Sequence, residues 1–177
     1  MSVAKGSGQV PHWQVLVQLA LAAEANAREL INDAEVLLEA ACWPRAYALA
    51  VLAHEEFGKG LMAMALVSAC PNVRTPTRLR ELTGGHMRKL MSAYEHEAMA
   101  GSYEQMAERL RSQELARGAN ERKQRGLYVD FVDDGSLRLP SEVGEDEART
   151  QVASVRKTVY SSGLRSISCF RVSRCGD

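Results

Sequence analysis

The chain has 177 residues, of which 46% are hydrophobic and 25% charged, as expected for one globular domain with a real core. Its 22 basic and 22 acidic residues cancel, which argues against a protein that coats nucleic acid, although a local basic patch stays compatible with this balance. No apolar stretch is long enough to span a membrane, and four cysteines without C-x-x-C spacing suit free thiols in a reducing compartment, so we expect a cytoplasmic protein.

Two long helices joined by a tight turn are predicted for the first 70 residues. In 12–42 the apolar residues recur at steps of three and four, and Trp43-Pro44 is expected to end this helix because proline disfavours the helical conformation of the residue before it. A second helix follows at once, and small residues on both apolar lines should let the two helices pack closely as an antiparallel hairpin. The predicted lines are Leu16, Leu19, Ala23, Ala27, Leu30, Ala34, Leu37 and Ala41, and then Ala46, Leu49, Ala53, Phe57, Leu61, Met64 and Val67.

Two further helices are predicted in the middle of the chain. The stretch 74–101 has helical spacing but contains Gly84-Gly85, a pair that often marks a kink or a cap, so its helix should start cleanly only at His86. The stretch 102–125 is highly charged and is expected to form a surface helix that frays towards its end.

The C-terminal third combines a hairpin signal with one more helix. Residues 127–139 carry an Asp134-Gly135 turn between β-branched and aromatic residues, which is typical of a short β-hairpin. Ser141 and the acidic residues after it should open a last helix. The predicted fold is therefore an all-α bundle with a small β-hairpin insertion, as a single domain over residues 1–163, followed by a tail, 164–177, expected to be disordered.

A charged cluster interrupts the apolar second helix in the sequence LAHEEFGKG, residues 52–60. Glu55 and Lys59 have the i, i+4 spacing of a surface ion pair, whereas Glu56 falls on the line that faces the core and is expected to be buried. Asn26 and Asp33 share a face of the first helix and are the expected partners of Glu56 and Lys59. Both a structural polar network and a functional site are compatible with this cluster.

A second group of candidate residues surrounds the start of the third helix. His86 and Lys89 lie one turn apart, and Arg80 precedes His86 by six positions. By chance alone, a sequence of this composition contains about one such arginine-to-histidine spacing, so the spacing by itself carries little information. A di-metal carboxylate site is excluded because the chain has no Glu-x-x-His motif, and no metal or other cofactor is expected.

The chain resembles the AbiV-type abortive-infection family, a branch of the HEPN-like helical proteins of prokaryotic defence. The resemblance rests on NARELINDAEVLLE (26–39), RAYALAVLAHEEFGKG (45–60), HMRKL (86–90) and RGLYVDF (125–131), and it covers roughly residues 20–160. It implies a HEPN-like helical domain, often homodimeric, that arrests growth or translation in an infected cell. It also places Tyr128 and Asp130, from the Leu-Tyr-Val-Asp block, in the polar network that supports the active surface.

Many HEPN relatives are metal-independent endoribonucleases with an Arg-x4-6-His motif, and here only Arg80 and His86 fit that motif. The resemblance then implies that His86 acts as the general base or orients the 2′-hydroxyl, that Arg80 or Lys89 stabilises the charge of the phosphorane, and that Glu56 and Lys59 form part of the groove. The alternative is a non-catalytic helical module that binds a phage or host protein. A nucleotide-binding helical domain is a weaker third hypothesis, since the sequence has no phosphate-cradling loop.

Overall fold

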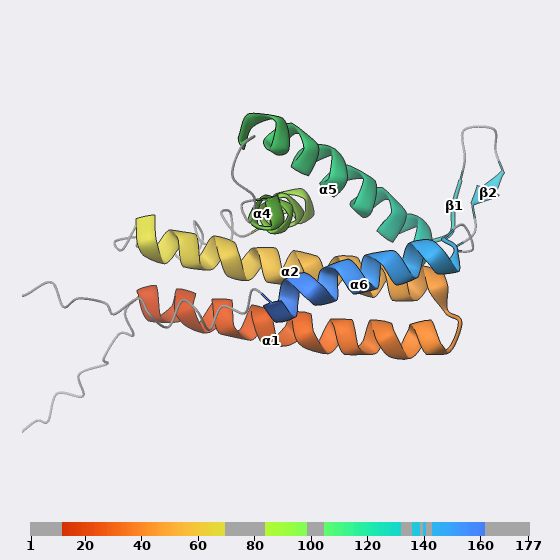
Figure 1. Ribbon diagram of the computed structural model, residues 1–177, viewed down its shortest axis with the longest axis horizontal. Coiled ribbons are helices and arrows are strands. Elements are labelled where there is room, and N and C mark those ends of the chain that lie inside the picture. Colours follow the sequence, from red (N-terminus) through yellow and green to blue (C-terminus); the bar gives the residue numbers. More distant parts are fainter. Residues whose placement is uncertain are drawn as a thin grey trace, which may run out of the picture.

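The protein was analysed as a computed structural model, which describes residues 12–69, 84–98, 105–131, 136–138, 140 and 143–161. In these ranges the fold is helical, as predicted, and Figure 1 shows its arrangement. The predictions for Arg80, for Ser141 and for the tail 164–177 concern residues outside the described part. The five described helices are α1 (His12–Glu39), α2 (Trp43–Ala69), α4 (His86–Ala98), α5 (Gln105–Leu127) and α6 (Glu145–Ser161).

Helices α1 and α2 form the predicted antiparallel hairpin and lie side by side along the molecule (Figure 1). Their connection differs from the prediction, because Trp43 and Pro44 begin α2 instead of ending α1. Helix α1 ends in a Schellman turn, in which the Cys42 amide donates to the Leu37 carbonyl at 2.8 Å and Ala41 adopts a positive φ of 54°. Proline suits the first turn of α2 because no partner for its missing N–H is needed there.

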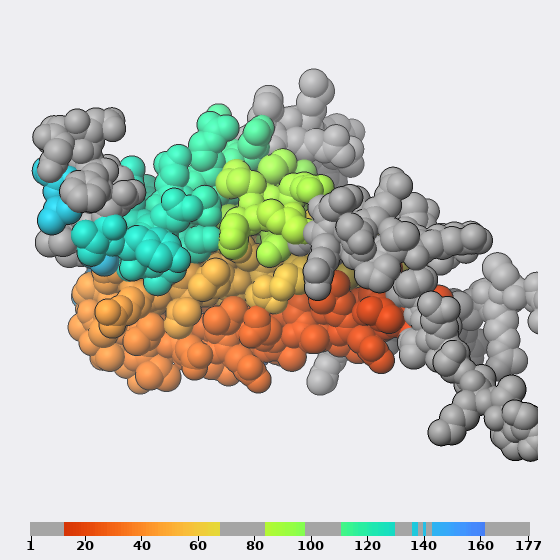
Figure 2. All heavy atoms as spheres, turned by 180° about the vertical axis from the view of Figure 1, so that it is seen from behind, coloured from red at the N-terminus to blue at the C-terminus, as the bar shows by residue number. Residues whose placement is uncertain are grey.

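Helix α2 is the centre of the fold, since it packs against each of the other four helices. In Figure 1, α1 runs below it, α4 and α5 lie above it and α6 crosses in front, while the view from behind in Figure 2 shows α4 and α5 resting on the hairpin. Burial is therefore not confined to one line of α2: Ala46, Tyr47, Ala48, Ala50, Val51, Ala53, His54, Glu55, Phe57, Gly58, Gly60 and Ala63 are all buried.

The buried line of α1 is shifted from the predicted one. It consists of Leu16, Ala20, Ala23, Ala27, Ile31, Ala34 and Leu38. Leu19, Leu30 and Leu37, which were predicted on the line, are half-buried at its edge. Alanine recurs along this line, so the backbones of α1 and α2 can approach closely over most of their length.

The remaining elements are short. Two strands, β1 (Asp130–Phe131) and β2 (Leu137–Arg138), pair antiparallel with Asp130 opposite Arg138. This ladder of two-residue strands is smaller than the β-hairpin insertion expected for 127–139, and residues 132–135 lie outside the described part. No helix in the described ranges combines the length and the apolar character that a membrane crossing requires.

Candidate functional site

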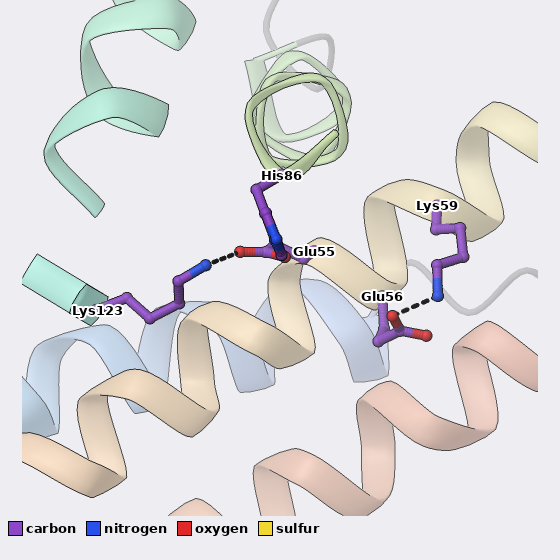
Figure 3. A network of polar contacts seen from close by, with 5 residues as sticks. All are labelled: Glu55, Glu56, Lys59, His86 and Lys123. Carbon is purple, nitrogen blue, oxygen red and sulfur yellow. Dashed lines mark hydrogen bonds and ion pairs between the residues drawn. The ribbon is translucent and has the colours of Figure 1, made fainter. Parts of the chain in front are cut away.

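The most unusual feature of the core is a carboxylate at its centre. Glu55 on α2 is 2% exposed, and its two carboxylate oxygens bind groups from two other helices. One oxygen lies 2.5 Å from Nδ1 of His86 on α4, and the other lies 2.5 Å from Nζ of Lys123 on α5. Figure 3 shows Glu55 between these two partners. The Lys123 side chain is only 6% exposed, whereas the His86 side chain is 64% exposed.

Two glycines hold α4 and α5 close enough to α2 for these contacts. A Cβ on Gly58 would lie 1.9 Å from the backbone oxygen of Lys89, one turn along α4 from His86. A Cβ on Gly126 would lie 2.6 Å from the Pro44 backbone oxygen, so α5 also contacts α2 with no room for a side chain. The backbones are therefore in contact within a turn of His86 and of Lys123, which fixes both side chains over Glu55.

The start of α4 is set by local backbone geometry. Gly85 has a φ of +86°, a conformation that L-amino acids with side chains rarely adopt, and the helix begins at the next residue. The prediction that this helix starts at His86 is therefore confirmed. As a result, His86 projects from the first turn of α4, and its side chain is largely exposed.

The two glutamates have the reverse of their predicted roles. Glu56, expected to be buried, is only partly buried and pairs with Lys59 at i, i+3, while Glu55, expected on the surface, is the buried one. In Figure 3 the Glu56–Lys59 pair points away from the Glu55 cluster. The prediction was wrong because it treated α2 as having a single buried face, whereas α4 and α5 cover the side that carries Glu55.

The predicted partners on α1 are also elsewhere. Asn26 and Asp33 are exposed, since each precedes a residue of the buried line, Ala27 or Ala34, and so falls on the outer side of the helix. They do not meet Glu56 and Lys59 inside the hairpin. Tyr128 is exposed just after α5 ends, and Asp130 is the first residue of β1.

A second polar cluster clamps the other end of α4. Nε2 of His54, which is 1% exposed, lies 3.2 Å from Oε1 of Glu97, a contact that is close but poorly aligned for a hydrogen bond. Thr158 of α6 donates a hydrogen bond to the same oxygen of Glu97. Burial alone would raise the pKa of Glu97, but its contacts with His54 and Thr158 outweigh burial and lower that pKa. The Tyr94 ring packs edge-on against His54, and burial raises the pKa of Tyr94 to about 12.

The consecutive residues His54, Glu55 and Glu56 thus have separate partners: His54 contacts Glu97 on α4, Glu55 binds α4 and α5, and Glu56 pairs with Lys59 on α2 itself. The sequence prediction omitted His54, Glu97 and Lys123. A signal for Lys123 was nevertheless present, because it lies on a line of small residues in α5 that the structure buries: Ser112, Ala116, Ala119, Lys123 and Gly126. A lysine at that spacing must either meet a carboxylate or break the packing.

The Glu55–His86 contact has a defined chemical consequence. A neutral imidazole that donates its Nδ1 hydrogen to the carboxylate keeps the lone pair on Nε2, so Nε2 is the nitrogen that can accept a proton. Lys123 balances the second carboxylate oxygen inside the core. Among the described residues, no group of three or more His, Cys, Asp and Glu side chains is placed to hold a metal ion.

The comparisons with known proteins agree with this helical architecture. The family model HEPN_AbiV, described as AbiV, matches residues 15–161, which include all the described helices except the first three residues of α1. No curated protein and no solved structure matches the chain significantly. Since the match covers most of the sequence, the chain belongs to the AbiV family of HEPN proteins.

Proposed function

We propose that this protein is an abortive-infection effector that arrests growth by cleaving RNA without a metal ion, with His86 as its general base. Membership of the AbiV family indicates a role in abortive infection, that is, in defence against phage. The observation that carries the proposal is an exposed histidine whose inner nitrogen is held by a buried, charge-balanced carboxylate. Because the His86 side chain is 64% exposed while its inner nitrogen is held, the imidazole can still be presented to a substrate.

The proposed reaction uses the 2′-hydroxyl of RNA as the nucleophile. Nε2 of His86 takes the proton from this hydroxyl, the 2′-oxygen forms a bond to phosphorus, and the bond from phosphorus to the 5′-oxygen breaks. The leaving 5′-oxygen takes a proton from water, so the products are a 2′,3′-cyclic phosphate and a 5′-hydroxyl. Glu55 is a positioning residue in this scheme: it sets the tautomer and orientation of the imidazole but does not touch the RNA.

Negative charge on the phosphorane oxygens would be stabilised by cations near His86. Lys89 follows it by one turn on α4 and therefore lies on the same face of that helix, which makes its ammonium a candidate for this role. Arg80 keeps this proposed role from the family motif. In a homodimer, which the family leads us to propose, a second copy would bring the same groups to the opposite side of the strand.

A second candidate function is a module that binds a phage or host protein. Exposed apolar side chains gather where α5 ends and the ladder begins: Leu127, Tyr128, Val129 and Leu137 are 37–62% exposed. Apolar residues grouped in this way favour contact with another protein. The polar clusters around α4 would then only keep the helices in register.

Cleavage by the purified protein distinguishes the two functions. The wild-type chain should fragment RNA in the presence of EDTA and leave 2′,3′-cyclic phosphate ends, and His86→Ala should reduce the rate by about 10²–10⁴-fold, the usual contribution of a general base. His96→Gln is the matched control, because His96 lies on the same helix but contacts the Phe57 ring instead of Glu55. Equal cleavage by wild type and His86→Ala would refute the assignment of His86.

A further inference from the structure

A groove of about 670 Å³ lies between α1 and α6, apart from the Glu55 cluster. In the described part of the chain, its lining residues come from these two helices and not from α4 or α5. In Figure 1, α6 crosses on the near face of the hairpin, whereas α4 and α5 lie along the upper side of α2. The floor is apolar, with Leu38 from α1 and the buried Val152 from α6.

The rim of the groove is cationic. Arg149, Arg156 and Lys157 of α6 line it, against a single carboxylate, Glu35 of α1. Nη1 of Arg156 lies 3.0 Å from Glu35, and Nε of Arg149 lies 2.7 Å from Glu145. A guanidinium has five N–H donors, so each arginine has more donors than the one nitrogen named in its ion pair.

The third cation, Lys157, is the least constrained. It is exposed, and no carboxylate in the described part of the chain forms an ion pair with it. Since Glu145 pairs with Arg149 and Glu35 pairs with Arg156, the three cations leave one positive charge in excess, that of Lys157.

One end of the groove is held in place by Tyr160. Its hydroxyl donates a hydrogen bond of 3.0 Å to Oδ1 of Asn32 on α1. The guanidinium carbons of Arg28 and Arg156 lie 4.7 Å and 5.9 Å from the centre of its ring. Two cations are thus gathered at this end, on side chains whose orientation the ring helps to fix.

We infer that this groove binds a phosphate-bearing nucleotide, with the phosphate on Arg149, Arg156 and Lys157 and the base against the apolar floor. A few polar groups around an apolar surface are typical of small-molecule sites. Guanidinium groups suit phosphate because they can bind two of its oxygens at once. The nucleotide is either a free mononucleotide or one unit of a single-stranded RNA.

The test is binding of a fluorescently labelled single-stranded RNA to the full-length chain, measured by anisotropy over a range of salt concentrations. All proteins carry His86→Ala, so that the RNA is not cleaved and failure of the proposed catalysis cannot affect the result. The groove variant adds Arg149→Ala and Lys157→Ala. The control adds Arg45→Ala, which removes an exposed cation of α2 that does not line the groove.

The logarithm of the binding constant falls linearly with the logarithm of the salt concentration, and each lost phosphate contact should make the slope of this line shallower by about 0.7 for a single strand. At about 0.1 M salt, this change corresponds to a roughly fivefold weaker affinity. The groove variant should therefore bind about 25-fold more weakly than the control at this salt concentration. Displacement of the labelled RNA by millimolar AMP would identify a mononucleotide pocket, and displacement by unlabelled RNA alone would identify a strand-binding groove. Equal affinity and salt dependence in the groove variant and the control, or no binding by either, would overturn the inference.

Discussion

Replacing Gly58 by alanine should destabilise the chain, because α2 and α4 are in backbone contact at this residue. In Gly58→Ala the new Cβ would lie 1.9 Å from the Lys89 backbone oxygen and 2.8 Å from its carbonyl carbon. Backbone atoms cannot rotate away as the end of a flexible side chain can. To restore an ordinary contact, α4 would have to move away from α2 by about 1.5 Å.

The expected change in stability combines two opposing effects. Overpacking of this kind costs about 1–3 kcal/mol, and a clash with backbone belongs at the upper end of that range. Replacing a helical glycine by alanine stabilises the helix by about 1 kcal/mol. The net loss should therefore be about 2 kcal/mol, or roughly 4–8 °C in melting temperature for a chain of this size.

Gly118→Ala on α5 is the matched control. It is the same substitution inside a helix, but a Cβ there would meet no atom within 4 Å. Its melting temperature should rise by about 2–4 °C, so the two variants should change in opposite directions. Thermal unfolding followed by circular dichroism measures both. A Gly58→Ala protein as stable as Gly118→Ala would refute the close packing of α4 on α2, and with it the placement of His86 over Glu55.

Three further predictions concern the core and the helix ends. Lys123→Met should lower the free energy of unfolding, measured with denaturant, by about 3–5 kcal/mol, because Glu55 loses its buried ion-pair partner. The double variant with Glu55→Met should recover most of that loss, and a double variant no more stable than Lys123→Met would contradict the pairing. Ala41→Gly should stabilise the chain by about 1 kcal/mol, since Ala41 holds a positive φ at the end of α1, and an unchanged or lower melting temperature would count against this turn. The pKa of Tyr94 is raised from 10.0 to about 12, so its contribution to stability should be complete below pH 10 and lost as the pH rises towards 12. Tyr94→Phe should lessen that alkaline loss, and identical pH profiles of unfolding would contradict it.

The long hairpin and the start of α4 could be predicted from the sequence because both depend on local signals. Apolar spacing over more than 20 residues determines α1 and α2, and a glycine with a positive φ determines where α4 begins. The end of α1 was misplaced because the local signal was missing there. Ala41 occupies a position where glycine is usual, so the sequence contained no sign of the turn.

The candidate site was harder to predict because it depends on tertiary packing. Which of two adjacent glutamates is buried depends on where α4 and α5 cross α2, and helical spacing along α2 does not contain that information. Glu55 has two partners, His86 and Lys123, which follow it by 31 and 68 positions along the chain. Only the line of small residues in α5 indicated that Lys123 would be buried, and it indicated no partner.

The most direct test of the central claim is growth of bacteria that express the chain, with total RNA examined on a gel, for the wild type, His86→Ala, Glu55→Gln and His96→Gln. We predict arrest with RNA fragmentation for the wild type and His96→Gln, loss of both effects in His86→Ala, and a strong reduction in Glu55→Gln. Arrest without fragmentation that persists in His86→Ala would contradict this prediction and would favour a protein-binding module.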